Sequence, residues 1–430
     1  MKVAVIGGGI SGIRAALTLA RAGVQTTLLE KNRHLGGRVF SFNTPDFGEV
    51  DIGQHIWLRC CTALEQLLAD LGVPDDWVFR QDRLAMTYRW PDGRCQALSA
   101  GWLPGRLSLL PFLFGVRLPW VDKLRLVRSM TRAGWYTAKK LETLDNLSLA
   151  DWLDQQRQPA SVIRWLWEPL VVGVCNGRLA EVSARHGLFT VRESLLKSGR
   201  AAAICCLRRP LSAVFDKYAR QVLESAGVRV LTGEAIRPGS GVLTEYDKVI
   251  LAVPLKRARE LLPHAGLPAP PEEGAIAGLL VRFAGPVMDE QFFSAAEGPI
   301  QIVFNKSAIW GRHEADGSQI VEVVISAAER EAKLGVEAVA AELLPELAKL
   351  LPRVRQTPVL AQRLLVHATA TFRVKPGGEV GRLPVTRPDL EKIVFAGDYA
   401  ATGWPSTMES AARAGQRAAN AILDPHGVTS

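Results

Sequence analysis

The sequence predicts an α/β fold that begins with a Rossmann-type dinucleotide-binding domain. Three observations indicate it: residues 3–6 form a short apolar run, residues 7–12 form a glycine-rich turn, and apolar residues then recur at helical spacing as far as Gly23. A second apolar run, residues 26–29, ends in an acidic side chain. Strand, glycine turn, helix and strand in this order hold a nucleotide pyrophosphate. We therefore expect a dinucleotide at this end of the chain.

The glycines of the turn have separate expected tasks. Gly7 permits the tight turn, Gly9 lets the backbone approach a pyrophosphate, and Gly12 lets the helix pack closely on the strand. The helix that follows presents unpaired N–H groups and the positive end of its dipole to the phosphates. Ile10 and Ser11, in its first turn, are therefore predicted cofactor contacts together with the three glycines.

The acidic residue after the second strand, Glu30, selects the kind of dinucleotide. Its carboxylate can accept hydrogen bonds from both ribose hydroxyls and would repel a 2′-phosphate, which indicates FAD or NAD rather than NADP. Lys31 beside it is included in the predicted site. Gly37 and Arg38 end a Gly-Gly-Arg segment that extends the phosphate-binding region and adds a cation for the diphosphate. A simple NAD dehydrogenase has no use for that segment, so it favours FAD.

The far end of the chain supplies a second set of predicted cofactor contacts. An apolar strand ends in Gly397 and Asp398, and a helix is expected to begin near Thr407 and Met408. At both ends the chain resembles the FAD oxidoreductases of the amine-oxidase and carotenoid-desaturase superfamily. The resemblance implies that Asp398 binds the ribityl chain and that the helix start faces the flavin pyrimidine. FAD is the predicted cofactor, held non-covalently because residues 403–408 contain no Cys or His.

Length and composition indicate how the rest of the chain is organised. With 430 residues, of which 48% are hydrophobic and 22% charged, a folded protein of two or three interleaved units is expected. We expect an FAD-binding domain in three pieces, a mostly helical substrate and membrane region, and an inserted α+β substrate domain. The FAD-binding pieces are residues 1–60, 211–260 and 385–425, the helical region is 61–210, and the sheet region is 261–384.

One basic segment, residues 101–140, predicts contact with a membrane surface. Eight cations and one acid there account for most of the formal net charge of +9, beside Trp, Phe and Leu residues that prolines interrupt. Apolar and aromatic side chains next to cations are typical of a segment in a membrane interface. A cover over a substrate cavity is the alternative. Nucleic acid is not a predicted partner, because no matching motif is present. The cations are Arg106, Arg117, Lys123, Arg125, Arg128, Arg132, Lys139 and Lys140.

Other features bear on location and on metal binding. No signal peptide is expected ahead of the first strand, which starts at Lys2, and no run of eighteen apolar residues is free of charge and proline. The six cysteines form no CxxC pair and histidines are few, so no metal site is predicted and reduced thiols are expected. The protein is expected in the cytoplasm, peripheral on the inner face of the cytoplasmic membrane.

Several inner segments resemble those of one group within the superfamily, the squalene-associated FAD-dependent desaturases, which are the hydroxysqualene dehydroxylases of bacterial hopanoid pathways. In two places the chain departs from the group: Ile52 stands where Asn is usual, and residues 175–178 replace a Leu-Asn-Thr-Pro segment. Members of the superfamily bind adenine through main-chain groups at the position that Ala235 occupies in this chain. The resembling segments are residues 51–55, 165–176, 193–196 and 396–409. The first of them supplies the predicted cofactor contacts Gly53, Gln54 and His55.

This resemblance implies reductive removal of an allylic hydroxyl from a long isoprenoid substrate. The hydroxyl takes a proton and leaves as water, and the allylic carbon receives a hydride from the reduced flavin, which gives squalene. The candidate catalytic residues are His55, Glu168 and Asp51. His55 titrates near neutrality, unless it only binds main chain beside the cofactor. Desolvation by neighbouring tryptophans would raise the pKa of Glu168, unless it forms a helix-end ion pair. Asp51 is expected to fix the turn that presents Gly53.

Other functions remain open at this point. An oxidative desaturase or cis–trans isomerase of a carotenoid-like polyene would use the same fold, with the hydride moving to FAD. A flavin amine oxidase would need an aromatic pair facing the flavin, and the segment around Trp404 offers one aromatic candidate. A non-catalytic FAD-bound scaffold for membrane enzymes is a further possibility. No motif assigns the electron donor.

Overall fold

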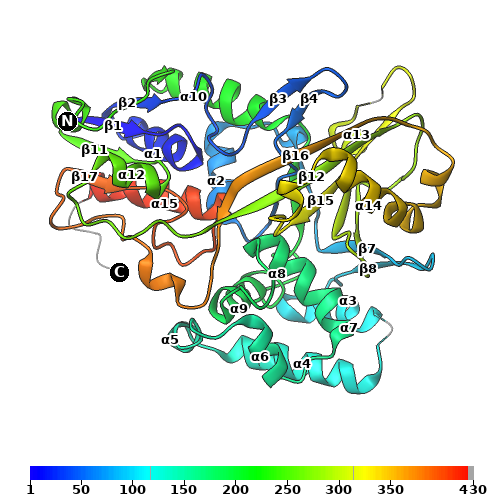
Figure 1. Ribbon diagram of the computed structural model, residues 1–430. Helices are drawn as coiled ribbons and strands as arrows, with labels where there is room; N and C mark the ends of the chain where they lie inside the picture. Colours follow the sequence, from blue (N-terminus) through cyan, green and yellow to red (C-terminus); the bar gives the residue numbers. More distant parts are fainter. Residues whose placement is uncertain (117, 313, 425–430) are drawn as a thin grey trace.

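A five-stranded parallel sheet gathers segments from the start, the middle and the end of the chain. The computed structural model describes residues 1–116, 118–312 and 314–424, so Arg117 and residue 425 of the predicted segments lie outside the described residues. In this sheet (Figure 1) β1 lies between β2 and β11, with β10 and β17 at the edges. Its strands are β1 (Lys2–Ile6), β2 (Gln25–Glu30), β10 (Arg229–Thr232), β11 (Lys248–Leu251) and β17 (Ile393–Phe395).

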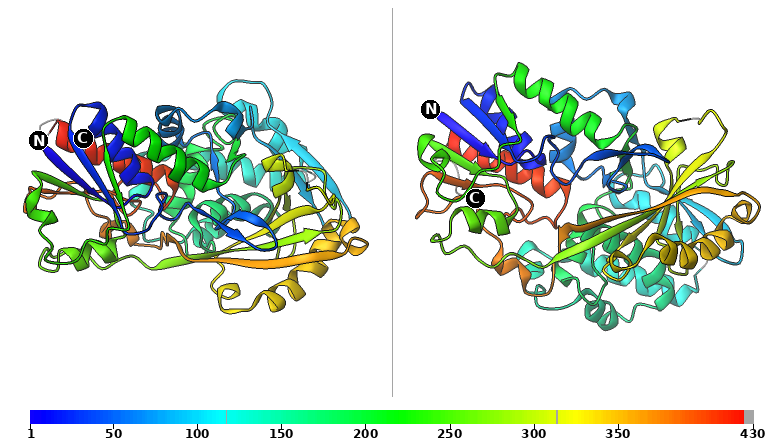
Figure 2. Two further views of the ribbon diagram at one scale, coloured as in Figure 1. Left: turned by 90° about the horizontal axis from the view of Figure 1, so that it is seen from above. Right: turned by 45° about the horizontal axis from the view of Figure 1, so that its top comes forward.

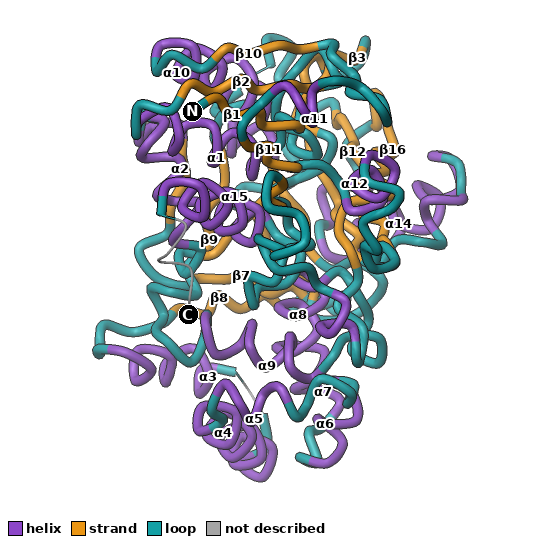
Figure 3. The backbone as a smooth tube through the Cα atoms, turned by 90° about the vertical axis from the view of Figure 1, so that its left-hand side faces the viewer, coloured by secondary structure: helices purple, strands orange, loops and turns teal. Residues whose placement is uncertain are grey.

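Two helices pack closely enough against each other and the first sheet to require glycine. α1 (Ile10–Arg21) and α15 (Met408–Leu423) lie side by side (Figure 3), and both bury mainly small or aliphatic residues. A Cβ at Gly12 would lie 1.8 Å from the carbonyl oxygen of Gly7. One at Gly415 would lie 2.2 Å from the carbonyl oxygen of Ser11. Gly12 therefore performs the close packing expected of it.

A seven-stranded mixed sheet forms the second unit (Figure 2), and α14 (Val336–Leu350) covers one of its faces. β7 and β8 form a hairpin around residues 91–93, and it joins this sheet where β7 pairs in parallel with β13. The long strands β12 and β16 extend toward the first sheet. The strands are β7 (Ala85–Arg89), β8 (Cys95–Ser99), β12 (Glu273–Phe283), β13 (Phe292–Ala295), β14 (Ile302–Asn305), β15 (Gln319–Ser326) and β16 (Val359–Phe372).

Helices α3 to α9 form a layer of their own at the foot of the molecule in Figure 1. Their core contains Trp152 and Trp167, two fully buried rings that meet edge to face with centroids 5.7 Å apart. Ser148 caps the start of α6, because its Oγ accepts the N–H of Asp151 at 3.1 Å. The helices are α3 (Leu110–Gly115), α4 (Trp120–Trp135), α5 (Ala138–Glu142), α6 (Leu149–Gln155), α7 (Ala160–Val162), α8 (Glu168–Cys175) and α9 (Ala184–Glu193).

Smaller elements link these three parts of the molecule. The strands are β3 (Ser41–Thr44) and β4 (Gly48–Asp51), which form a hairpin, and β5 (Ile56–Leu58), β6 (Val78–Arg80) and β9 (Ile204–Leu207), which form a three-stranded sheet. The helices are α2 (Thr62–Leu71), α10 (Ala219–Ser225), α11 (Val242–Glu245), α12 (Leu255–Leu261) and α13 (Lys306–Trp310). No helix within the described residues has the length and apolar character needed to cross a bilayer. All six cysteines are free thiols.

Candidate functional site

The glycine turn after β1 contains crowded glycines, Gly7 and Gly8 among them, and one glycine with more room, Gly9. Gly7 has a φ of +109°, and a Cβ there would lie 2.3 Å from the carbonyl oxygen of Ala252. At Gly9, in contrast, the nearest heavy atom to a Cβ is the Cα of Gly37, at 3.9 Å. Gly9 and Gly37 thus face each other without side chains between them. This arrangement allows a pyrophosphate to approach the backbone.

The carboxylate of Glu30 lies buried at the end of β2 and is already oriented by the backbone. Its Oε2 accepts the N–H of Gly8 at 2.7 Å, and its Oε1 accepts the N–H of Asn32 at 2.8 Å. Each carboxylate oxygen has a further lone pair. Glu30 can therefore accept hydrogen bonds from ribose hydroxyls without any rearrangement of the turn.

The predicted adenosine contacts lie next to Glu30. The backbone N–H of Glu234 donates to the carbonyl oxygen of Glu30 at 2.9 Å, which brings the loop after β10 beside the end of β2. Ala235 follows on that loop and is exposed, as is Lys31. Their contacts with the cofactor stay predictions.

An ion pair joins the predicted cofactor residues from the two ends of the chain. Nη2 of Arg38 lies 2.5 Å from Oδ1 of Asp398, and Nη1 of Arg38 donates to the carbonyl oxygen of Ala370 at 3.2 Å. Ser406 Oγ donates to the other oxygen of Asp398. Burial would raise the pKa of Asp398, but Arg38, Ser406 and Arg382 outweigh it and hold the pKa below its usual value. Asp398 is therefore a carboxylate that can accept a hydrogen bond from a hydroxyl group.

The start of α15 is capped and fixed against a neighbouring helix. Thr407 Oγ1 accepts the N–H of Ser410 at 3.3 Å, while Met408 begins the helix. The buried carboxylate of Glu409 accepts two N–H groups at the start of α2, at 3.1 and 2.8 Å. Helix α15 therefore presents its N-terminal N–H groups from a rigid position, which suits an electron-rich ring system.

A buried charged cluster surrounds the Gly-Gln-His segment, between β4 and the second sheet. Lys306 Nζ donates to Gln54 Oε1 at 2.7 Å and lies 3.4 Å from Asp51 Oδ2. Glu322 Oε2 is 3.8 Å from the same ammonium, and Glu322 Oε1 accepts the backbone N–H of Gln54 at 3.0 Å. Burial raises the pKa of Glu322, and the Lys306 charge opposes that shift. The cluster places one ammonium between two carboxylates beside a predicted flavin contact.

Sequence reasoning did not find Lys306 or Glu322. Lys306 begins α13 directly after the apolar strand β14, and Glu322 lies in the middle of β15. They are 3% and 1% exposed. The sequence did offer one signal for them: each is a charged residue in or beside an otherwise apolar strand. Such a residue is rarely buried without a partner, so this pattern indicates a buried ion pair.

Two histidines lie close to this cluster, and burial keeps both of them neutral. Nδ1 of His55 bonds the carbonyl oxygen of Gly53 at 2.8 Å, and burial lowers the pKa of His55. Burial also lowers the pKa of His367, on β16, to about 4, and the charge of Arg38 adds to that effect. Neither imidazole holds an extra proton at neutral pH, so His55 is suited to hydrogen bonding.

The other two candidate catalytic residues differ in their surroundings. Asp51 accepts hydrogen bonds from Ser41 Oγ at 2.7 Å and from the N–H of Leu211 at 2.9 Å, which fixes the end of β4. Glu168 begins α8 in the helical layer; burial raises its pKa, and Arg164 opposes that shift. Among the described residues, no hydrogen bond or ion pair joins Glu168 to the Lys306 cluster. The structure thus pairs Asp51 with Lys306 and places His55 where both charges act on its pKa, whereas no such contact within the part of the chain that the structure describes reaches Glu168.

Comparison with known families identifies the group to which this site belongs. The family described as flavin containing amine oxidoreductase matches residues 10–423. The chain belongs to this family. It is an FAD-dependent oxidoreductase. The site fits this cofactor, since the backbone at Gly9 and Gly37, which carries no side chains, suits a pyrophosphate, Glu30 suits ribose hydroxyls, and Asp398 suits a ribityl hydroxyl.

Relatives within and around this flavoenzyme family cover nearly the whole chain. The hydroxysqualene dehydroxylase of Rhodopseudomonas palustris is 30% identical over 448 residues, which is 98% of each chain. The zeta-carotene desaturase of a Synechocystis species is 22% identical and covers 98% of this chain and 97% of its own.

Among solved structures, wild-type putrescine oxidase bound to putrescine superposes with a TM-score of 0.70, at 18% identity, over 98% of this chain and 99% of that chain. This likeness shows a shared α/β flavoprotein fold, so the predicted α/β fold class with a parallel nucleotide-binding sheet is confirmed.

Proposed function

We propose that this flavoenzyme removes the allylic hydroxyl of hydroxysqualene reductively and releases squalene. The observation that carries the proposal is the similarity to the hydroxysqualene dehydroxylase of Rhodopseudomonas palustris, which extends over 98% of both chains. The flavin site described above is compatible with this chemistry. The second candidate is desaturation of a carotenoid-like polyene, which the lower similarity to zeta-carotene desaturase favours.

The aromatic residues near the cofactor site do not favour oxidation of a small amine. Trp404 is the one aromatic residue of the segment 403–408. Its ring meets Phe189 edge to face with centroids 5.2 Å apart, and the guanidinium of Arg413 lies 4.9 Å from its centre. A ring engaged in this way packs the helical layer against α15, and residues 403–408 contribute no second ring for an amine cage.

The proposed reaction exchanges a C–O bond for a C–H bond. The leaving hydroxyl takes one proton and departs as water, and the allylic carbon takes one hydride, which bound reduced FAD supplies. Lys306 is the side chain that can hold this proton, at Nζ, where Gln54 and Asp51 orient the ammonium. The neutral His55 orients rather than protonates. A buried site with little water stabilises the charges that develop in the reaction less than bulk water would. The fixed carboxylates of Asp51 and Glu322 supply part of this stabilisation.

An anaerobic turnover experiment tests the reaction and its direction. Enzyme reduced with dithionite and mixed with hydroxysqualene should yield squalene, measured by mass spectrometry, with one flavin reoxidised for each product formed. Oxidised enzyme mixed with a carotenoid-type polyene is the parallel arm. Flavin reduction by the polyene, with hydroxysqualene left unchanged, would replace the dehydroxylase proposal by the desaturase candidate.

We further propose that α3, α4 and the segment before them rest on the inner face of the cytoplasmic membrane. Trp102, Trp120 and Trp135 are 90%, 73% and 78% exposed. Helix α4 buries one apolar face in the helical layer, through residues that include Leu126 and Met130, and still carries apolar residues outward. Together with these tryptophans, the exposed apolar residues are Leu103, Leu107, Leu110, Phe114, Val121, Leu124 and Val127.

The low water solubility of the proposed substrate explains why the enzyme would need a surface that binds membranes. Squalene-sized isoprenoids are insoluble in water, so an enzyme that acts on them collects them from a bilayer. Lys123 Nζ lies 5.3 Å from the centre of the exposed Trp120 ring, and it and neighbouring cations such as Arg125 would face anionic headgroups. We infer that the second sheet and the helical layer together form the inserted substrate region. Sedimentation with vesicles of anionic lipid at low and high salt tests the surface, and a protein that stays in the supernatant in both would contradict it.

A further inference from the structure

The loop between β17 and α15 carries Asp398 and leads into the helix start that faces the cofactor. Two glycines shape it, Gly397 with a φ of +142° and Gly403 with a φ of +80°. Because the loop is irregular, its carbonyl oxygens lack the partners that a strand or helix would supply, and buried carbonyls without partners are costly. The loop therefore depends on hydrogen bonds from outside it.

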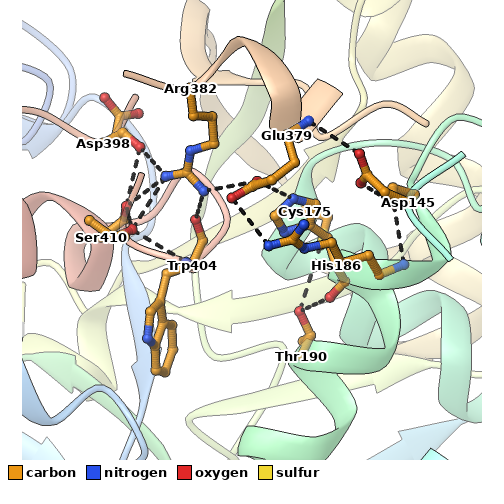
Figure 4. Close-up of polar contacts among 12 residues, drawn as sticks. Asp145, Cys175, His186, Thr190, Glu379, Arg382, Asp398, Trp404 and Ser410 are labelled. Carbon is orange, nitrogen blue, oxygen red and sulfur yellow. Dashed lines mark hydrogen bonds and ion pairs between the residues drawn. The ribbon is translucent and has the colours of Figure 1, made fainter. Parts of the chain in front are cut away.

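One side chain supplies most of those hydrogen bonds. Arg382, which is 5% exposed at its side chain, donates to three main-chain carbonyl oxygens of the loop at 2.5 to 2.8 Å (Figure 4). The acceptors are Asp398, Ala400 and Trp404. Its guanidinium also lies within 3.4 Å of the hydroxyl of Ser410, in the first turn of α15. A planar guanidinium can reach several acceptors in fixed directions, which an ammonium cannot.

Arg382 is itself held from the helical layer. Oε2 of Glu379 lies 3.4 Å from Nη1 of Arg382 and 2.9 Å from Nε2 of His186, on α9. Arg185, also on α9, reaches the other oxygen of Glu379 at 3.5 Å. Figure 4 shows Glu379 between the guanidinium and the imidazole. The flavin loop is thus connected through two ion-paired residues to a helix of the proposed substrate region.

We propose that Arg382 is a positioning residue for FAD, which fixes the backbone of the loop so that Asp398 and the start of α15 meet the cofactor. Arg38 and Ser406 orient the carboxylate of Asp398, whereas Arg382 holds its main chain from the opposite side. Without the guanidinium the carbonyl of Trp404 would need water or a new loop conformation, and those of Asp398 and Ala400 would keep one donor each, Ser410 Oγ and the N–H of Thr402. The carboxylate would then no longer be held in place for the cofactor.

The release of FAD from the purified holoenzyme tests this proposal, without any use of substrate. Arg382→Ala should release FAD at least about tenfold faster, because the loop loses three hydrogen bonds that hold it in the conformation that binds the cofactor. The rise of flavin fluorescence on dilution follows the release. Arg382→Lys should stay closer to Arg382→Ala than to the original protein, because one ammonium cannot span three carbonyls. Added guanidinium at low millimolar concentration should slow release from Arg382→Ala.

Arg387→Ala is the matched control, because Arg387 is also paired with an acid, Asp389, and donates to a carbonyl, that of Ala265, but does not contact the flavin loop. It should release FAD at the original rate. A shift of the visible flavin spectrum in Arg382→Ala, absent in Arg387→Ala, would separate positioning from a general loss of stability. If Arg382→Ala does not fold, Arg382→Lys and Glu379→Gln carry the same test. Unchanged FAD release and an unchanged spectrum in the folded variants would overturn the proposal.

Discussion

The flavin site and the α3–α4 segment differ in how far their apolar and charged residues are buried. Helix α15 buries most of its small residues as it packs against α1, and the Asp398 side chain that pairs with Arg38 is 8% exposed. Helix α4 exposes Trp120 and Leu124, and its ion pair between Asp122 and Arg125 lies at the surface. Cofactor binding in the first region depends on the exact positions of individual atoms. Membrane binding proposed for the second region depends on the sum of many similar side-chain contributions.

This difference predicts how each region responds to substitution. A single change in the flavin site should have a large effect, because close-packed backbone and buried charge have few ways to relax. A single change in the α3–α4 segment should have a small effect, because exposed contacts and surface charges contribute in small, roughly independent amounts. The following predictions run from the largest expected effect to the smallest.

Gly12→Val should cause the largest loss. The added Cβ would lie 1.8 Å from the carbonyl oxygen of Gly7, and β1 and α1 cannot separate without opening the cofactor site. We expect a loss of about 3 kcal/mol or more in the free energy of unfolding, and protein without FAD. Thermal unfolding and the flavin absorbance of the purified protein measure both effects.

Gly173→Ala, in α8, is the control for that substitution, because no heavy atom lies within 4 Å of a Cβ there. It should be neutral or stabilise the protein by up to about 1 kcal/mol, as alanine favours a helix over glycine. Equal stability of Gly12→Val and Gly173→Ala would contradict the packing of α1 on β1.

Lys306→Met should keep FAD and lose turnover. The variant removes the proposed proton source but keeps a long apolar chain in the buried position, so single-turnover reoxidation with hydroxysqualene should slow about a hundredfold or more. Lys349→Met, a surface lysine paired with Glu346 on α14, should behave like the original enzyme. Reoxidation at the original rate in Lys306→Met would remove the lysine from the proposed chemistry.

Two other candidate acids, His55 and Glu168, can be compared in the same assay. His55→Ala should slow reoxidation moderately through lost orientation, since the imidazole is neutral and bonded to the carbonyl oxygen of Gly53. Glu168→Gln should leave the rate within a few-fold, because no hydrogen bond or ion pair among the described residues connects it to the Lys306 cluster. A hundredfold loss in Glu168→Gln would place the acid in the helical layer instead.

Glu30→Ala should weaken FAD binding by about 1.5–3 kcal/mol, the cost of losing charge-assisted hydrogen bonds. The N–H groups of Gly8 and Asn32 would also lose their acceptor, which loosens the turn. Fluorescence titration with FAD measures the change. Glu234→Ala is the control, because Glu234 contributes its main chain to this region and its side chain is exposed. Equal affinities for the two variants would argue against a ribose contact at Glu30.

Neutralising Lys123, Arg125 and Arg128 together should have the mildest effect. Each cation near an anionic surface contributes about 1 kcal/mol at most, and salt screens that contribution. We expect weaker sedimentation with anionic vesicles at low salt and little change at high salt. Trp120→Ala combined with Trp135→Ala should weaken binding at both salt concentrations. If neither variant changes sedimentation, the segment only covers the substrate region.

The sequence by itself predicted FAD and a set of residues to hold it. Gly7, Gly12 and Glu30 were predicted because each meets a local requirement, such as a positive φ, a close approach of two backbones, or an acid at the end of a strand, whereas the role of Asp398 was predicted from the resemblance to a flavoenzyme superfamily. Such requirements depend on neighbours in the chain. They can therefore be read from spacing and residue type alone.

Only the tertiary structure revealed the groups that complete the site. Lys306 meets Asp51 across 255 residues, and Glu379 meets His186 across 193 residues, so neither contact leaves a pattern in local sequence. The outward face of α4 was equally hidden, because the hydrophobic periodicity of a helix does not say which of two apolar faces finds a partner in the core. Burial and pairing are properties of the folded chain, and folding brings these distant residues together.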